Sequence, residues 1–401
     1  MASIKVKFRP SAVAGNEGTI YYQIIHERKV RQICSDNKVF PEEWNDRRSV
    51  VAVCPEKERK TLILSIRECI RRDVERLTRI IRKMDTDSIC YTADDVVEEF
   101  NCYVHEYSLF NFMEKIIVRL RSNGNIRTSE TYTAALRSFR KFRKEKDIML
   151  DMLDSGIMEA YEAWHKQHGV VPNTISFYTR ILRATYNRAV EQDVIENRYP
   201  FKHVYTGVDK TVKRALTLDA IKKIKMLDLS TAPVLNFARD MFLMSFYLRG
   251  MSFIDMAYLK KTALSNGYVT YRRRKTGQQL TIEWTKEMQT ILDNYSENES
   301  GYLLPIITTH GADERSIYRN ACCKINRHLK KIAVMAGITV PLTLYVARHS
   351  WASAARTKGI PLRVISEGMG HDSEATTQIY LASLDSSAVD RANSLIMRSI
   401  E

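Results

Sequence analysis

The chain has 401 residues, and its 62 lysines and arginines outnumber its 47 aspartates and glutamates, which gives a formal net charge of +15. This length exceeds what one typical core covers, so we expect two or three domains. The positive charge favours a polyanionic partner, most simply nucleic acid. It excludes the class of acidic proteins, whose negative charge would repel such a partner. Charge alone does not exclude the alternative, which is a basic, solvated surface without such a partner.

Motifs and cysteine spacing exclude several further classes. The seven cysteines form no CxxC pair and no spacing typical of metal ligands, as expected for reduced thiols in the cytoplasm. Neither a signal peptide nor a long apolar run is present, so we expect no membrane insertion. The motifs of P-loop, serine-hydrolase and zinc-peptidase enzymes are also missing.

The N-terminal part is predicted to be a small sheet followed by a helix. Alternating apolar residues predict strands over 4–9 and 19–25, and a third over 30–34, before a helical turn at 41–45. Isoleucine, valine and leucine at helical spacing then predict a long helix through 63–81. The other face of that helix carries the arginines Arg67, Arg71, Arg72, Arg76, Arg79 and Arg82.

The second segment, 106–206, has a helical pattern throughout. Thr128 is predicted to cap one helix, and Pro172 to open another. Their basic side chains are candidate contacts to DNA phosphates, with solvated surface charge as the alternative. These candidates are Arg137, Arg140, Lys141, Arg180, Arg183 and Arg188.

A linker and a third domain follow. Residues 203–214 show little apolar periodicity and suit a connection that crosses a duplex, and Thr217 is predicted to start the next helix. Strand-like runs on both sides of Thr276-Gly277 predict a hairpin that carries Lys275. Near the C-terminus, the spacing of apolar residues over 386–400 predicts a short amphipathic helix.

The C-terminal part also contains the residues best suited to chemistry. Arg348 directly precedes His349, and Gly370 directly precedes His371. Tyr380 comes nine positions after His371. An arginine can bind both non-bridging oxygens of a phosphate, and a histidine can donate to them or move a proton. A tyrosine can hold a phosphate covalently. Together these residue types suit phosphodiester exchange without a metal.

The order and spacing of these motifs resemble the tyrosine recombinases, the phage integrase family. The resemblance implies a multidomain, mainly α protein with small β elements. Its parts would be an arm-binding-like N-terminal domain (1–90), a helical SAM-like core-binding domain (106–206) and a catalytic domain with a small antiparallel sheet (214–401). In such a protein Tyr380 attacks phosphorus, and Arg348 and His371 bind the non-bridging oxygens.

The hairpin has an implied role as well. By resemblance Lys275 protonates the leaving 5′-oxygen, with a phosphate-binding hairpin that moves no proton as the alternative. The neighbouring arginines are then expected to contact the DNA backbone, and these are Arg272, Arg273 and Arg274.

Two positions depart from the family pattern. Ser252 stands where the first arginine is usual, and we expect Arg249, one helical turn earlier, to replace it, with Arg239 as a more distant alternative. Tyr345 stands where a histidine is usual, and its hydroxyl can still donate to phosphate. Asp255 matches an acidic residue that orients arginines.

The resemblance also implies partners and setting. The expected partners are double-stranded DNA, further copies of the chain in a tetramer on paired sites, and optional accessory DNA-bending proteins, with no cofactor. The expected setting is the nucleoid in the bacterial cytoplasm, as an integrase or invertase of a mobile element. Two alternatives stay open. One is a type IB-like topoisomerase, which shares the chemistry, and the other is a catalytically silent DNA-binding protein of this fold, which Ser252 and Tyr345 make possible.

Overall fold

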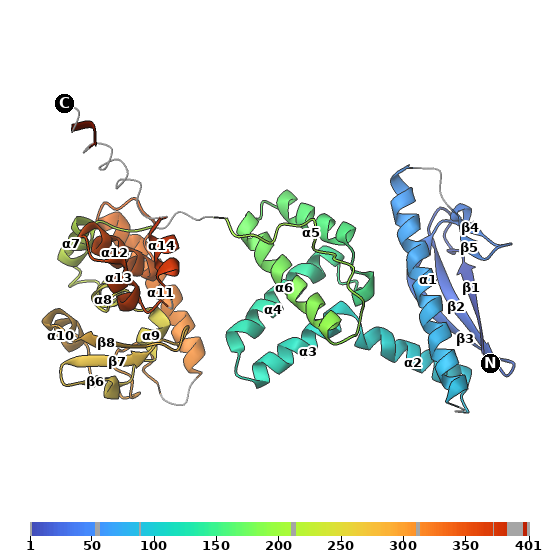
Figure 1. Ribbon diagram of the computed structural model, residues 1–401, viewed down its shortest axis with the longest axis horizontal. Coiled ribbons are helices and arrows are strands. Elements are labelled where there is room, and N and C mark those ends of the chain that lie inside the picture. Colours follow the sequence, from blue (N-terminus) through green and yellow to red (C-terminus); the bar gives the residue numbers. More distant parts are fainter. Residues whose placement is uncertain are drawn as a thin grey trace. The chain divides into compact units, whose positions relative to one another are not determined.

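The computed structural model describes residues 2–52, 57–87, 90–209, 214–309, 313–371, 373–382 and 396–398. The chain divides into two compact units, Met1–Asp209 and Lys210–Glu401. The fold is mainly helical with small antiparallel sheets, as predicted (Figure 1). Within the described ranges, no helix is long and apolar enough to cross a bilayer.

The first unit begins with a three-stranded antiparallel sheet in the order β1-β2-β3, formed by Ser3–Arg9, Gly18–His26 and Lys29–Val39. The strands predicted from the alternation are therefore confirmed. On β2, Ile20, Tyr22 and Ile24 face inward and are fully or almost fully buried. A 3₁₀ turn (Pro41–Glu43) and the short strands β4 (Trp44–Asn45) and β5 (Val50–Val51) follow. The long helix α1 (Lys57–Thr86) packs on this sheet (Figure 1).

A helix that the sequence had not predicted completes this N-terminal core. Helix α2 (Ala93–Glu106) begins at Thr92, whose side chain accepts a hydrogen bond from the Asp95 amide. Its residues Val96 and Phe100 are buried in one cluster with Tyr22 of the sheet. The N-terminal core therefore extends past residue 90, to the end of α2.

Four helices form the next part of the first unit: α3 (Leu109–Ser122), α4 (Ile126–Arg143), α5 (Ser155–Gln167) and α6 (Pro172–Glu191). Pro172 opens α6 as predicted, because its fixed φ and missing N–H suit the first helical position. The predicted cap at Thr128 is wrong: α4 begins earlier, after Asn125, and Thr128 lies inside its first turn.

Two buried arginines of α1 hold these parts of the first unit together. Arg76 donates to both carboxylate oxygens of Asp151 at 2.6 Å, and Arg72 binds the Asp151 carbonyl. Asp151 lies in the 3₁₀ turn Leu150–Met152 between α4 and α5. We call Arg72, Arg76 and Asp151 the clasp. These two arginines, predicted on an outer basic face, are 7% and 5% exposed and pair internally.

In the second unit, helix α8 (Pro233–Tyr247) is the centre of the core. Its residues Met241, Phe242 and Met244 are fully buried, and the helix packs against α11 (Glu314–Met335) and α12 (Leu344–Thr357). Before it, Thr217 caps α7 (Leu218–Met226) by accepting from the Ala220 amide, as predicted.

The remaining elements surround this core (Figure 1). The small sheet has the order β6-β7-β8. Its β7–β8 hairpin is the predicted one, with Arg272 paired with Gln279 next to the turn. The remaining elements of the second unit are α9 (Phe253–Ala257), a 3₁₀ turn (Lys261–Ala263), β6 (Leu264–Ser265), β7 (Tyr268–Arg272), β8 (Gln279–Glu283), α10 (Lys286–Asp293), α13 (Leu362–Met369) and α14 (Glu374–Ala382).

Candidate active site

Arg348 is the centre of the candidate site. It lies in the middle of α12 and is only 3% exposed. Its Nη1 donates to the Gly250 carbonyl at 3.0 Å, and its Nη2 donates to the Met369 carbonyl at 2.6 Å. A buried guanidinium held by carbonyls in this way keeps its orientation without a bound anion.

The close approach of α12 to the turn after α8 depends on a glycine. Gly250 has φ +74°, and a Cβ at this position would lie 2.6 Å from the Arg348 Cα. Any side chain here would therefore push α12 away and move the guanidinium. Gly250 is thus required for the position of Arg348, on grounds of space as well as of backbone conformation.

A second arginine binds next to the first. Gly370 ends α13 in the left-handed conformation, and its carbonyl accepts from Nη1 of Arg273. Arg348 and Arg273 therefore bind the consecutive carbonyls of residues 369 and 370, directly before His371. Arg273 is 7% exposed. Arg273 was predicted to contact the DNA backbone together with its neighbours, and in this structure its guanidinium binds the Gly370 carbonyl.

His371 joins Arg348 to the last helix of the site. Its Nε2 is 3.1 Å from Nη2 of Arg348, and its Nδ1 is 2.7 Å from the Thr377 hydroxyl. Thr377 lies on α14 and is fully buried. Tyr380 is three residues further along the same helix. Its side chain lies outside the described residues, so the structure places only its position on α14.

The other basic residues of the hairpin turn are exposed, in contrast to buried Arg273. Lys275 is exposed in the turn, and so are Arg272 and Arg274. The Arg274 guanidinium lies over the Tyr258 ring, 4.3 Å from its centroid. Lys275 therefore stays available to a ligand in front of the turn, whereas Arg274 is partly engaged by an aromatic ring.

The segment around Ser252, where the family's first arginine is missing, differs from the expected helix. Arg249 does not share a helix with Ser252: it has φ +57° in the turn after α8, and Ser252 is the N-cap residue directly before α9. The argument from one helical turn is therefore wrong. The Ser252 hydroxyl donates to Asp255, whose other oxygen accepts from the Arg274 amide. Asp255 thus holds the backbone of the arginine-rich turn in place.

Three arginine charges nevertheless act on the partly buried phenol of Tyr271. Burial raises the pKa of Tyr271, and the charge of Asp255 adds to the increase. The positive charges of Arg348, Arg273 and Arg249 act in the opposite direction. The sequence pattern does not single out Tyr271, because its place in β7 is like that of other strand residues.

The other candidates of the second unit lie as follows. Tyr345 is 54% exposed in the first turn of α12, and its ring meets that of buried His349 edge-on, with 4.7 Å between centroids. Arg239 donates to the Leu227 carbonyl, and its guanidinium also binds Asp240 and Asn236. These bonds within and beside α8 are structural, which makes Arg239 a poor substitute for the missing arginine.

The six candidate DNA contacts of the helical segment differ in exposure and pairing. Arg137, Lys141 and Arg180 are exposed, as a surface for a polyanion requires. Arg188 is half-buried. Arg140 binds Glu114 at 2.6 Å and lies over the Phe110 ring, and Arg183 donates to Thr206.

Two protein-family models and several curated relatives match this chain. The phage integrase SAM-like domain matches residues 108–204, and the phage integrase family matches residues 217–387. The chain is 24% identical over 291 residues to the tyrosine recombinase XerD of Listeria monocytogenes, covering 67% of this chain and 92% of the relative.

Solved structures show the same fold at low sequence identity. A lambda integrase tetramer bound to a Holliday junction has a TM-score of 0.53 and 16% identity, covering 68% of this chain and 77% of that one. The Tn1549 transposon integrase in complex with a circular intermediate DNA has a TM-score of 0.50 and 15% identity, covering 73% of this chain and 99% of that one.

Proposed function

Because the chain belongs to the phage integrase family of tyrosine recombinases, we propose that Tyr380, Arg348, His371 and Lys275 are the residues with which it breaks and rejoins DNA. One observation carries this proposal. Buried Arg348 contacts His371, and His371 contacts the helix on which Tyr380 lies. These contacts bring three segments that are separate in sequence into one site.

The chemistry follows from these groups. The Tyr380 oxygen attacks the scissile phosphorus, which forms a 3′-phosphotyrosyl bond as the bond to the 5′-oxygen breaks. Lys275 gives its proton to that leaving oxygen. Arg348 balances the charge on the non-bridging oxygens. The reverse attack by a 5′-hydroxyl rejoins the strand and frees the tyrosine, so the bond energy is kept and no nucleotide cofactor is consumed.

The second cation of the site needs an assignment, since Ser252 occupies the usual arginine position. Arg273 is the better placed residue, because it is buried and binds the carbonyl next to the one that Arg348 binds. Arg249 is the alternative, since its charge also acts at Tyr271. Two guanidiniums allow both non-bridging oxygens to be bound at once, which one arginine alone does less well.

The substrate is double-stranded DNA, and three parts of the chain act on it. The exposed residues Arg137, Lys141 and Arg180 of the helical segment contact phosphates. The N-terminal sheet with α1 and α2 is an accessory, arm-binding domain. The similarity to a transposon integrase supports an element-encoded integrase as the biological setting.

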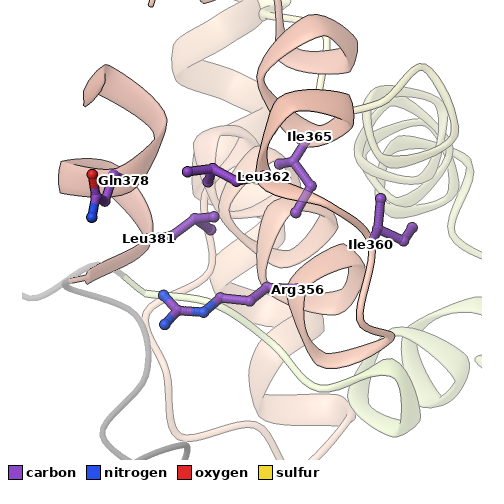
Figure 2. A pocket seen from close by; sticks show the side chains of 6 residues that line it. All are labelled: Arg356, Ile360, Leu362, Ile365, Gln378 and Leu381. Carbon is purple, nitrogen blue, oxygen red and sulfur yellow. The ribbon is translucent and has the colours of Figure 1, made fainter. Parts of the chain in front are cut away.

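Assembly as a tetramer on paired sites is supported by a pocket of the second unit (Figure 2). Leu362, Ile365 and Leu381 line it, with Arg356 and Gln378 beside them. The predicted amphipathic helix 386–400 falls mostly outside the described residues, but 396–398 are helical, and Ile396 and Met397 are exposed. We place this segment of a neighbouring protomer, with its apolar side chains, in the pocket.

One assay separates this function from its alternatives. The protein is incubated with nicked suicide duplexes that carry its cognate site and with supercoiled plasmid. A covalent adduct with recombinant products supports the recombinase. Relaxation without recombinants indicates a topoisomerase, and a mobility shift without an adduct indicates a silent DNA-binding protein. Tyr380→Phe should abolish the adduct and leave DNA binding nearly unchanged, because only the nucleophilic oxygen is lost. An adduct with this variant would place the nucleophile elsewhere.

A further inference from the structure

We propose that Thr377 is a positioning residue that holds His371 in one tautomer and joins it to the helix of the nucleophile. The proposal rests on the role given to His371 above. It starts from two contacts on opposite sides of the imidazole ring, one to Arg348 and one to Thr377.

The contact to Arg348 indicates which ring nitrogen lacks a proton in the folded protein. A guanidinium has only donors, so His371 Nε2, 3.1 Å from Nη2 of Arg348, must accept. A neutral imidazole that accepts at Nε2 carries its proton on Nδ1. A protonated ring would instead bring an N–H towards the N–H groups of a buried cation. His371 is therefore neutral in the free protein, with the proton on Nδ1.

The contact to Thr377 provides the matching acceptor. Nδ1–H donates to the Thr377 hydroxyl across 2.7 Å. Thr377 is fully buried, and a buried hydroxyl without a hydrogen bond is costly, so this contact benefits both groups. The partner of one ring nitrogen decides the protonation of the other. Thr377 thus keeps Nε2 free of a proton and aimed at Arg348.

The same contact links the nucleophile to the phosphate-binding arginine. Thr377 lies on α14, three residues before Tyr380. His371 donates to the Thr377 hydroxyl through Nδ1, and Arg348 donates both to Nε2 of His371 and to the Gly250 carbonyl. A shift of α14 therefore disturbs the hydrogen bonds of Arg348. It also follows that His371 donates to a phosphate oxygen through Nε2 only after it takes up a proton.

Three variants of the full chain test this role. Thr377→Val keeps the shape and removes the hydroxyl, and Thr377→Ser keeps the hydroxyl. Thr376→Val is the matched control, because Thr376 is the exposed neighbour on the same helix and bonds to Ser373 instead. The first readout is the nitrogen NMR spectrum of histidine-labelled protein without DNA, with the His371 signals identified by a His371→Gln variant.

We expect wild type, Thr377→Ser and Thr376→Val to show the proton on Nδ1 of His371. Thr377→Val should lose this signature, because the ring then has no Thr377 hydroxyl to hold its Nε2 against Arg348. Single-turnover cleavage should fall about 10- to 100-fold in Thr377→Val, the loss expected for one hydrogen bond at a buried group. The serine variant should retain most of the rate. Melting temperatures show whether each variant is folded.

Two results would overturn the proposal. One is a wild-type His371 with its proton on Nε2, and the other is a Thr377→Val protein that keeps the Nδ1 proton. The NMR measurement needs neither DNA nor cleavage. Failure of the wild-type protein to cleave DNA would therefore count against the proposed function and not against the tautomer.

Discussion

The clasp at Asp151 offers a direct test of how the first unit is held together. Besides the arginine contacts, two backbone hydrogen bonds cross the junction. The Leu109 amide donates to the Ile148 carbonyl at 2.8 Å, and the Leu150 amide donates to the Tyr107 carbonyl at 3.1 Å. These bonds tie the short link between α2 and α3 to the segment that carries Asp151. We predict that Asp151→Asn loosens this junction.

The magnitude follows from burial and from the partners that remain. Removing one partner of a buried ion pair costs about 3–5 kcal/mol, because a charge is left without compensation. The Asp151 side chain is 30% exposed, which reduces the cost. In the variant Arg76 keeps Asp73, and Arg72 keeps Glu68. We therefore expect a loss of about 2–3 kcal/mol in the free energy of opening the junction.

Hydrogen–deuterium exchange at the Leu109 and Leu150 amides measures that opening. A loss of about 2–3 kcal/mol corresponds to exchange about 30- to 150-fold faster. Arg71→Gln is the matched control: Arg71 is exposed on the same helix and pairs with Glu68 and Glu75 of that helix. Unchanged exchange in Asp151→Asn, or equal acceleration by Arg71→Gln, would refute the role of the clasp.

Two further predictions concern the second cation and a buried histidine. Arg273→Met should lower single-turnover cleavage about 100-fold or more with little change in DNA binding, whereas the matched change at its exposed neighbour, Arg272→Met, should cost far less. If Arg249→Met alone loses cleavage, Arg249 supplies the cation instead. In α5, His165 is 3% exposed, and burial lowers its pKa below the ordinary value of 6.5. The unfolded chain therefore binds a proton more readily than the folded one, so stability should fall as the pH decreases through 6.5 towards the lowered pKa. Melting curves at pH 7 and pH 5.5 should show a smaller pH effect in His165→Gln than in wild type, and an equal effect in both would contradict this.

Local chemistry was sufficient to predict much of the fold. The alternation over 19–25 marks β2, Pro172 marks the start of α6, and Thr217 marks the cap of α7, because each signal depends on neighbours in sequence. The hairpin around Lys275 was predictable for the same reason. The spacing of the C-terminal motifs was likewise enough to indicate the family and its chemistry, since the residue types themselves limit which reactions are possible.

Tertiary packing decided which of several similar side chains take part. Arg272, Arg273 and Arg274 are equivalent in sequence, and only contact with Gly370 buries the middle one. The sequence does not show which basic residues of α1 lie opposite Asp151, nor that Thr377 meets His371. Arg249 takes its left-handed conformation in a turn that brings Gly250 against Arg348. Such contacts join residues far apart in the chain, so their energies are set by the folded core and not by local pattern.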